Sequence, residues 1–224
     1  MTKKKTDPVV HKIACIHHVT LSGTLAERIH PAKTHKEVTF HFKPGVNVLC
    51  GPNGSGKSTI MATLYPSNMS PGEREFKIKV DPGPCRHMDF EKNNPRVQSS
   101  FNDYQPMGFQ VVVRRTSHGE MVKALTSGFP KASGLKGACM LMDEPEVALD
   151  IDGIFDMVRG LEHRMTHPDV HPINQYVIAT HAPAILLNPL FNVIELVPGY
   201  RDRVSRSLGA ILHKERSDGP GGEP

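Results

Sequence analysis

The sequence lacks a long hydrophobic run, a signal-peptide pattern and any internal repeat. Its longest apolar stretch is interrupted near Asn188 and Glu195, so it falls short of the roughly 20 residues that a membrane-spanning helix needs. The basic start of the chain is not followed by an apolar segment of about 7 to 15 residues, which a secretory signal would require. We therefore expect no membrane insertion and a cytoplasmic location.

Paired cysteines are also missing. The four cysteines are Cys15, Cys50, Cys85 and Cys139. They form no C-x-x-C pair, and three of them lie in apolar, strand-like runs, so we expect small core residues. His163, His167 and His171 recur at every fourth position, but Pro168 would end a helix before the third. This pattern favours a solvated helix end over a metal site.

Length and charge place the chain among ordinary globular proteins. Its 224 residues suit one α/β domain, and the apolar and charged fractions, 38% and 22%, do not indicate disorder. The net charge of +4 gives weak support for an acidic partner such as nucleic acid. No basic stripe with interleaved aromatic residues adds to that support.

Apolar runs alternate with segments of helical spacing along much of the chain. Strands are predicted at Ile13–Leu21, Val38–Phe42, Val46–Cys50, Phe76–Val80, Phe109–Val113, Ala138–Met142, Tyr176–Ala179 and Val193–Leu196. Helices are predicted at Lys57–Leu64, after Gly119 and at Ile151–Met165. The alternation indicates an α/β core with a largely parallel sheet. Residues 1–216 are predicted to form one domain with an irregular, proline-rich insert at about 66–108, and residues 217–224 a disordered tail.

A glycine-rich loop follows the strand that ends at Cys50. Its residues are Gly51, Pro52, Asn53, Gly54, Ser55, Gly56, Lys57, Ser58 and Thr59. They satisfy the pattern G-x-x-x-x-G-K-[ST] between a predicted strand and a predicted helix, which is the context that a P-loop requires. Glycines allow consecutive N–H groups to point at phosphate oxygens. Lys57 would reach the β- and γ-phosphates of ATP, and Ser58 would hold Mg²⁺.

Two further strands end in polar residues suited to phosphoryl transfer. The strand at Ala138–Met142 leads into Asp143 and Glu144, which suit the metal and the attacking water respectively. Taken alone, such a pair could be solvated acids at a strand end. The strand at Tyr176–Ala179 leads to His181, which would lie at the same sheet edge and could hydrogen-bond the γ-phosphate or the water.

The ordered motifs resemble those of ABC-type ATPases. They are Gly51–Thr59, Ser117-His118-Gly119-Glu120, Met142-Asp143-Glu144-Pro145-Glu146, Ala148-Leu149-Asp150 and Ala179-Thr180-His181. In family order they match Walker A, signature, Walker B, D-loop and His-switch, over roughly Ile13 to Leu196. The resemblance implies a P-loop NTPase fold of ABC-ATPase type, with an additional antiparallel β portion and a reduced helical and signature region.

The resemblance also implies how ATP would be held. ATP would lie between the P-loop of one subunit and the signature of another, where Ser117 and Gly119 would donate to the γ-phosphate in a homodimer. The family's Mg²⁺-contacting glutamine would be Gln98, in preference to Gln105 or Gln110. His118 and Glu120 depart from the transporter signature L-S-G-G-Q. With this departure the chain is more similar to small stand-alone ABC ATPases and to the SMC-like group of DNA-maintenance ATPases than to transporter subunits. The interval of about sixty residues between Lys57 and Ser117 excludes long coiled-coil arms.

Three functions remain open from the sequence. The first is a DNA-linked ATPase in repair, defence or phage biology. The second is an ATP-operated clamp that serves a protein partner with slow turnover, and the third is the energy subunit of a transporter. The signature and the absence of an evident helical subdomain disfavour the third.

Overall fold

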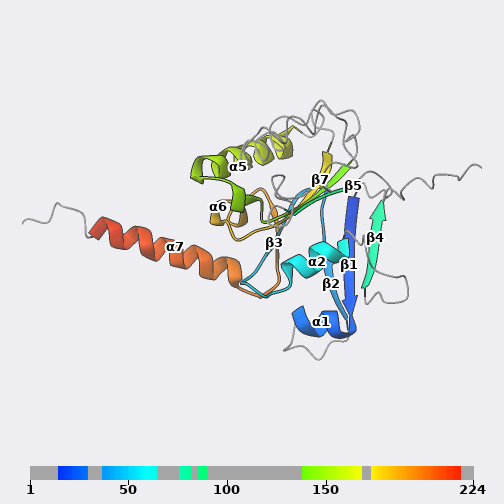
Figure 1. Cartoon of the computed structure of the whole chain (residues 1–224). Helices are drawn as coiled ribbons and strands as arrows, with labels where there is room; N and C mark the ends of the chain where they lie inside the picture. The colour runs from blue at the N-terminus through cyan, green and yellow to red at the C-terminus, as the bar shows by residue number, and fades with distance from the viewer. Residues whose placement is uncertain are drawn as a thin grey trace, which may run out of the picture.

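The computed structural model describes residues 15–29, 37–64, 76–81, 85–89, 138–167 and 173–217 (Figure 1). The elements in chain order are β1 (Cys15–Ser22), α1 (Gly23–Ile29), β2 (Glu37–His41), β3 (Gly45–Cys50), α2 (Lys57–Leu64), β4 (Phe76–Asp81), β5 (Cys85–Asp89), β6 (Ala138–Asp143), the 3-10 helix η5 (Pro145–Ala148), α5 (Ile151–Thr166), β7 (Ile173–Ala179), α6 (Pro183–Leu186), β8 (Asn192–Glu195) and α7 (Tyr200–Ser217).

A parallel sheet forms the centre of the fold. Its five strands have the order β5-β6-β7-β3-β8, and every neighbouring pair is parallel. The runs in β3, β6 and β7 are mostly apolar because elements cover the sheet on both faces. Since these three strands are neighbours and run the same way, their carboxyl ends meet at one edge. The residues that follow Cys50, Asp143 and Ala179 therefore lie side by side.

A second, antiparallel sheet has the order β2-β1-β4. Cys15 on β1 pairs with Asp81 on β4, and the register shifts between Ile16 and His18. The buried side chain of Gln175 joins the two sheets: its Oε1 accepts from Ile16 N at 2.7 Å and its Nε2 donates to Ile16 O at 2.8 Å. The antiparallel portion implied by the family resemblance is thus present, held to β7 by buried polar contacts.

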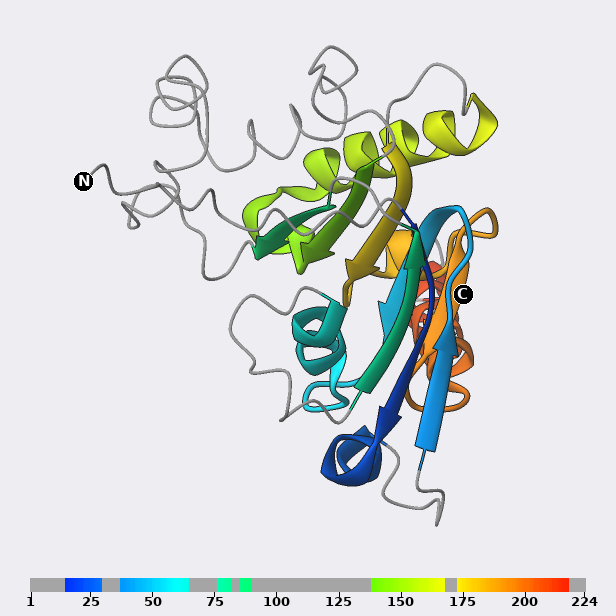
Figure 2. The same ribbon diagram turned by 90° about the vertical axis from the view of Figure 1, so that its right-hand side faces the viewer.

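Two hydrophobic clusters pack on opposite faces of the parallel sheet. Figure 2 shows α5 on one side of this sheet and α2 on the other. On one face, α5 and α6 pack through Met157, Val158, Leu161, Ile185 and Leu186. The other face is covered by α1, α2 and the antiparallel sheet, through Ile16, Leu21, Ile29, Ile60, Met61 and Leu64. Burying each such large side chain contributes about 1.5–3 kcal/mol. All four cysteines are buried and free, as the sequence predicted.

The predicted strands and helices within the described residues are present, with ends that either match or differ by up to three residues. The elements that the sequence did not predict are α1, β5, η5, α6 and α7. Ser217 was predicted to begin a disordered tail, and this was wrong because it is the last residue of α7. The expected strand at 109–113, the helix after Gly119 and residues 218–224 lie outside the described residues. The full boundaries of the domain stay a prediction.

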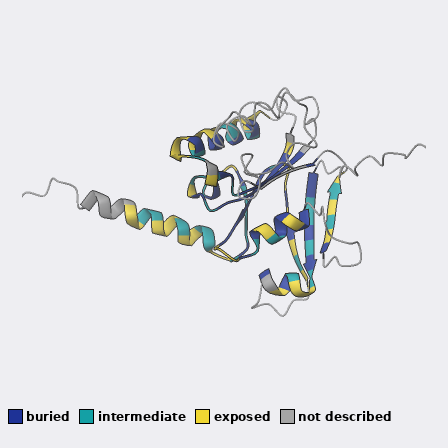
Figure 3. Cartoon of the chain, in the orientation of Figure 1, coloured by how far each residue is buried: buried dark blue, intermediate teal, exposed yellow. Residues whose placement is uncertain are grey.

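Helix α7 extends away from the sheets, and its residues 200–211 are exposed or half-buried (Figures 1 and 3). Tyr200 and Val204 attach its start to the cluster that contains α5 and α6. Within the part of the chain that the structure describes, no helix combines the length and the apolar character needed to cross a membrane.

Candidate functional site

The loop between β3 and α2 depends on two glycines with positive φ, Gly54 at 75° and Gly56 at 97°. A Cβ atom on Gly56 would lie 2.7 Å from Cγ1 of Ile29, whereas one on Gly54 would meet nothing within 4 Å. Helix α1, which the sequence did not predict, therefore packs directly against the loop. This contact adds a packing requirement at Gly56 to the conformational one.

Lys57 lies under this loop and is 5% exposed. Its Nζ donates to the backbone oxygens of Gly51 at 3.1 Å and Pro52 at 3.3 Å. Burial lowers the pKa of Lys57, while the negative charges of Glu144 and Asp143 oppose that shift. Within the described residues, the buried ammonium group thus donates to neutral carbonyl oxygens, and an anionic ligand would stabilise its charge further.

A cavity of about 380 Å³ opens beside this lysine. Its walls include Asn53, Gly54, Gly56, Lys57, Ser58, Thr59, Ile29 and Glu144. The buried Oγ of Ser55 has no hydrogen-bond partner among the described residues. An unpartnered hydroxyl beside a buried cation and a glycine-rich cradle fits a phosphate chain.

The end of β6 carries the two predicted carboxylates. Asp143 is 8% exposed and lies at the carboxyl end of the strand. Glu144 follows with φ 49° and ψ 55°, the left-handed conformation that non-glycine residues rarely adopt. Its backbone N–H donates to the oxygen of Ala179 at 2.9 Å, which ties the turn to β7. Such a backbone costs on the order of 1–3 kcal/mol and is concentrated at functional sites.

His181 lies against Glu144, with 3.4 Å between His181 Nε2 and Glu144 Oε1. Burial lowers the pKa of His181, and the positive charge of Lys57 lowers it further, against the opposing charges of Glu144 and Glu146. The imidazole is therefore neutral at neutral pH, with one nitrogen able to accept a hydrogen bond and the other able to donate one.

Glu146 makes a contact to which the sequence analysis gave no role. Its Oε1 accepts hydrogen bonds from the Thr180 hydroxyl and from the backbone N–H of His181, both at 2.7 Å. The Thr180 hydroxyl oxygen in turn accepts from Ala182 N at 2.9 Å. We call Glu146, Thr180 and the backbone of His181 the Glu146 latch. The latch connects the turn after β6 to the turn after β7 and holds the backbone of His181.

The structure brings Lys57, Asp143, Glu144 and His181 to one edge of the parallel sheet, as the ends of apolar strands predicted. Asn53 and Ser58 are exposed there, and Thr59 is half-buried. Ser117, Gly119 and Gln98, together with the alternatives Gln105 and Gln110, lie outside the described residues. The motif Asp-Glu-Pro-Glu was the available sequence signal for Glu146, but only the fold shows what it contacts.

The oxygen groups at this edge fit Mg²⁺, which prefers hard oxygen ligands and shares them with substrate phosphates. Ser58 is the second residue of α2, directly after Lys57, and Asp143 is the last residue of β6. A hydroxyl and a carboxylate are available there, and the remaining coordination can come from phosphate and water. For His163, His167 and His171 the sequence favoured a solvated helix end over a metal site. The rings of His163 and His167 stack with 4.3 Å between their centroids at the exposed end of α5, and His171 lies outside the described residues.

Comparisons with known proteins agree with the P-loop segment. A family model described as an AAA domain matches residues 28–64, which contain β2, β3, the loop and α2. The DNA double-strand break repair Rad50 ATPase of Nanoarchaeum equitans (strain Kin4-M) is 46% identical over 33 residues, 15% of this chain and 4% of that protein. The DNA replication and repair protein RecF of Limosilactobacillus reuteri (strain DSM 20016) is 35% identical over 46 residues, 20% of this chain and 12% of that protein.

Solved structures with some likeness cover more of the chain at low identity. One is a metal-chelate type ABC transporter in an inward-facing conformation, with a TM-score of 0.45, 16% identity and coverage of 88% of each chain. Another is a dimeric ATP-binding cassette in a post-hydrolysis state with ADP and Pi, with a TM-score of 0.45, 16% identity and coverage of 80% of this chain and 92% of that one. The family model matches only the segment around the P-loop, and both relatives match only short segments of this chain, which span a small part of the relatives' length. With the strand order around the P-loop, the family match shows an α/β fold with a P-loop, and the ordered motifs resemble those of ABC-type ATPases.

Proposed function

We propose that this protein binds ATP with Mg²⁺ and hydrolyses it at the edge formed by β3, β6 and β7. The observation that carries the proposal is that Glu144 and the buried Lys57 line one cavity, while His181 Nε2 lies 3.4 Å from Glu144 Oε1. A cation, a carboxylate and a neutral imidazole are the groups that phosphoryl transfer to water uses.

In this proposal the loop and α2 hold the phosphates. Backbone N–H groups from Asn53 to Thr59 and the Lys57 ammonium donate to phosphate oxygens, so Lys57 exchanges its two carbonyl acceptors for charged ones. Ser58 and Asp143 would hold Mg²⁺, with Gln98 as the expected further contact. When bound, Mg²⁺ neutralises charge on the β- and γ-phosphates.

Glu144 would orient and polarise the attacking water. Its left-handed backbone directs it toward the cavity that Lys57 lines, and Glu144 itself contributes to the wall. His181, kept neutral by burial, would hydrogen-bond the γ-phosphate or the same water through Nε2. Because the Glu146 latch holds the His181 backbone, the two groups keep a defined separation.

The assembly that we propose is a homodimer in which each ATP contacts two chains. Ser117 and Gly119 of one chain would complete the site formed by the P-loop of the other, and twofold symmetry would give two equivalent sites. A protein partner is compatible with the same arrangement. A mixture of Lys57→Ala and Ser117→Arg chains should regain part of the activity that each lacks alone, because the mixed dimer contains one intact site.

We propose that the ATPase serves DNA maintenance, defence or phage functions. The P-loop segment is similar to two proteins whose names state DNA repair roles, Rad50 and RecF. The net charge of +4 is compatible with an acidic partner. The alternatives are a clamp for a protein partner and the nucleotide-binding subunit of a transporter, for which no contact of the described residues gives specific support.

Glu144→Gln and Lys57→Ala test the ATPase. Glu144→Gln should bind a fluorescent ATP analogue as the parent does, lose multiple-turnover hydrolysis and accumulate as a dimer in sedimentation with ATP and Mg²⁺. Lys57→Ala should lose nucleotide binding while it stays folded by circular dichroism. Parental hydrolysis by Glu144→Gln, or parental nucleotide affinity of folded Lys57→Ala, contradicts the site.

The DNA-linked role needs a separate measurement. Glu144→Gln with ATP should bind double-stranded DNA with an affinity that falls as salt rises, and omission of ATP should weaken that binding. Co-purification of a second protein, without DNA binding or DNA stimulation of hydrolysis, would favour the clamp instead.

A further inference from the structure

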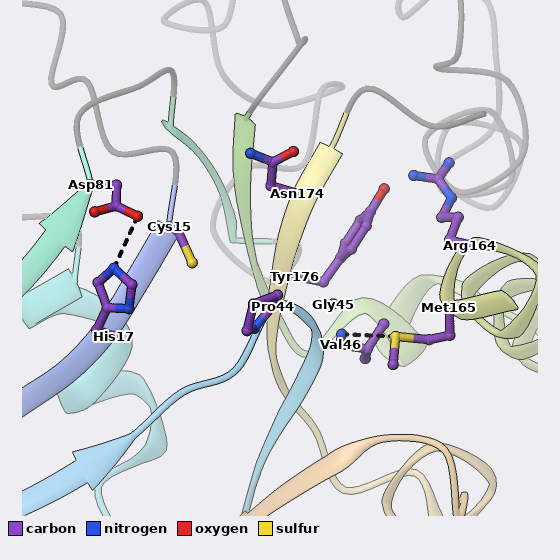
Figure 4. A pocket seen from close by; sticks show the side chains of 10 residues that line it. All are labelled: Cys15, His17, Pro44, Gly45, Val46, Asp81, Arg164, Met165, Asn174 and Tyr176. Atoms are coloured by element: carbon purple, nitrogen blue, oxygen red, sulfur yellow. Dashed lines mark hydrogen bonds and ion pairs between the residues drawn. The ribbon is translucent and has the colours of Figure 1, made fainter. Parts of the chain in front are cut away.

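A second cavity, of about 480 Å³, lies at the opposite edge of the parallel sheet from the P-loop. It is bordered by the starts of β3 and β7, by the end of α5 and by β1 and β4. Figure 4 shows Cys15, His17 and Asp81 on one wall and Arg164 and Tyr176 on the other. None of these residues takes part in the proposed ATPase chemistry.

Cys15, His17 and Asp81 form a compact group of metal-binding side chains. One ligand atom from each lies within 4.8 Å of the others, and His17 Nε2 is 2.9 Å from Asp81 Oδ2. The Cys15 side chain is buried, whereas the side chains of His17 and Asp81 are 41% and 59% exposed. The group is therefore accessible from solvent on one side and closed by the core on the other.

The backbone builds this group through an irregularity in β1. Cys15 pairs directly with Asp81, but the register then shifts between Ile16 and His18, so His17 is the extra residue of a β-bulge. Bulges redirect side chains and are frequent next to functional sites. Here the bulge brings the His17 imidazole to the Asp81 carboxylate, the cross-strand partner of Cys15.

Buried contacts hold the bulge in place from both sides. Gln175 from β7 binds the N–H and the C=O of Ile16, and the oxygen of His17 accepts from Phe42 N at 2.8 Å. The main chain that carries the first two ligand residues is therefore fixed before any ligand arrives. Preorganised ligands lose little conformational freedom on binding.

We propose that Cys15, His17 and Asp81 bind a Zn²⁺ ion. A thiolate, an imidazole and a carboxylate are the three ligand types that zinc uses, with distances of about 2.0–2.3 Å. Ligand atoms around a tetrahedral ion at those distances are separated by roughly 3.3–3.8 Å, so the group needs only small side-chain adjustments. The fourth position faces the cavity and is taken by water. Three protein ligands with one open position are typical of zinc sites that act on a ligand rather than only support the fold.

The cavity wall opposite the proposed zinc ligands indicates which kind of ligand the open zinc position would bind. The Arg164 guanidinium lies over the Tyr176 ring, with 5.1 Å from its central carbon to the ring centroid, and Arg164 is 6% exposed. A metal on one side and a buried cation on the other make the cavity suitable for small anions. The alternative is a plain ion pair of His17 with Asp81 beside a core thiol, and this would bind no metal tightly.

The test uses the full chain, stripped with a chelator and then titrated in excess Mg²⁺, so that the nucleotide site does not take up the added metal. Elemental analysis after gel filtration should find one Zn²⁺ per chain. With Co²⁺ as the spectroscopic probe, a thiolate-to-metal charge-transfer band should develop to the same stoichiometry, and Zn²⁺ should displace it.

Variants assign the metal to this group. Cys15→Ser should remove the charge-transfer band, and His17→Ala and Asp81→Asn should each weaken Zn²⁺ binding by at least about tenfold. His18→Ala, the next histidine on the same strand, is the matched control and should bind as the parent does. If Cys15→Ser does not fold, Zn²⁺ binding by Asp81→Asn, a change at an exposed side chain, tests the proposal instead. A band that survives Cys15→Ser, equal effects of His17→Ala and His18→Ala, or no stoichiometric Zn²⁺ would overturn the proposal.

Discussion

Replacing Glu146 by alanine tests whether the Glu146 latch couples the two catalytic turns. The change removes the oxygen that accepts from Thr180 and from the backbone of His181, two bonds of 2.7 Å. Hydrogen bonds to a charged group contribute about 1.5–3 kcal/mol each, so full loss of both would cost about 3–6 kcal/mol. Glu146 is half-buried, so water can replace part of the hydrogen bonding that the substitution removes. We therefore expect Glu146→Ala to lower the free energy of unfolding by about 2–4 kcal/mol.

The same substitution should affect hydrolysis more than nucleotide binding. Without the latch the backbone of His181 loses its anchor, so the imidazole no longer keeps its 3.4 Å approach to Glu144. Misplacing a catalytic group by about 1 Å can cost up to a hundredfold in rate, so we expect kcat to fall by about tenfold to a hundredfold. The affinity for ATP should stay near that of the parent, because within the described residues the Lys57 ammonium donates to Gly51 O and Pro52 O and not to Glu146.

Urea unfolding and steady-state hydrolysis, measured on the same preparations, check both expectations. Asp156→Ala is the matched control, since its carboxylate lies on the exposed face of α5 and its ion pair with Arg159 is at the surface, where such a pair is worth about 0–1 kcal/mol. Glu146→Gln should be intermediate, because the amide oxygen can still accept both bonds but carries no charge. If Glu146→Ala matches Asp156→Ala in stability and in kcat, the latch has no role.

Three further perturbations follow from the same structure. Gly56→Ala should cost about 2 kcal/mol or more in urea unfolding and reduce nucleotide binding, because its Cβ would meet Ile29; Gly54→Ala has open space and should cost only about 1 kcal/mol. Gln175→Ala should cost about 3 kcal/mol, because it leaves the buried N–H and C=O of Ile16 without partners, and a loss under 1 kcal/mol would contradict its role as the link between the sheets. His181→Gln tests pH dependence. The lowered pKa of His181 means that the unfolded chain binds a proton that the native chain rejects, so stability falls as the pH drops below about 6.5. The fall in urea midpoint between about pH 6.5 and 5 should be shallower in this variant, and an unchanged slope would refute the assignment.

The sequence alone predicted the parallel sheet and the sheet edge at which the proposed nucleotide site lies. The runs that end at Cys50, Asp143 and Ala179 are apolar because both faces of their sheet are covered, and each is followed directly by polar residues. Parallel strands have their carboxyl ends at one edge, so the ends of three local patterns could be placed together without a structure. This is why Lys57 and Glu144 were correctly expected to meet.

Helix α7 shows where local pattern was insufficient. Seven of its 18 residues are charged, and Tyr200 and Val204 in its first turns pack against the core. Tyr200, Val204, Leu208 and Ile211 recur at helical spacing, but none of them is fully buried in the fold. Such a weakly buried stripe in a polar stretch is a weaker signal than the broad apolar face of a core helix. The edge strand β5 was missed for a related reason, because Cys85–Asp89 mixes polar and apolar residues without clear alternation.

Tertiary structure alone decided the contacts between distant residues. The Glu146 latch depends on the left-handed turn at Glu144, which no local rule requires of a glutamate. The group of Cys15, His17 and Asp81 depends on antiparallel pairing across more than sixty positions and on a one-residue bulge. A one-residue change of register moves side chains to the other face of a sheet, so such a group forms only when the pairing is set by packing elsewhere. Gln175 and the core beneath it set that pairing here, because the buried N–H and C=O groups of Ile16 must find partners.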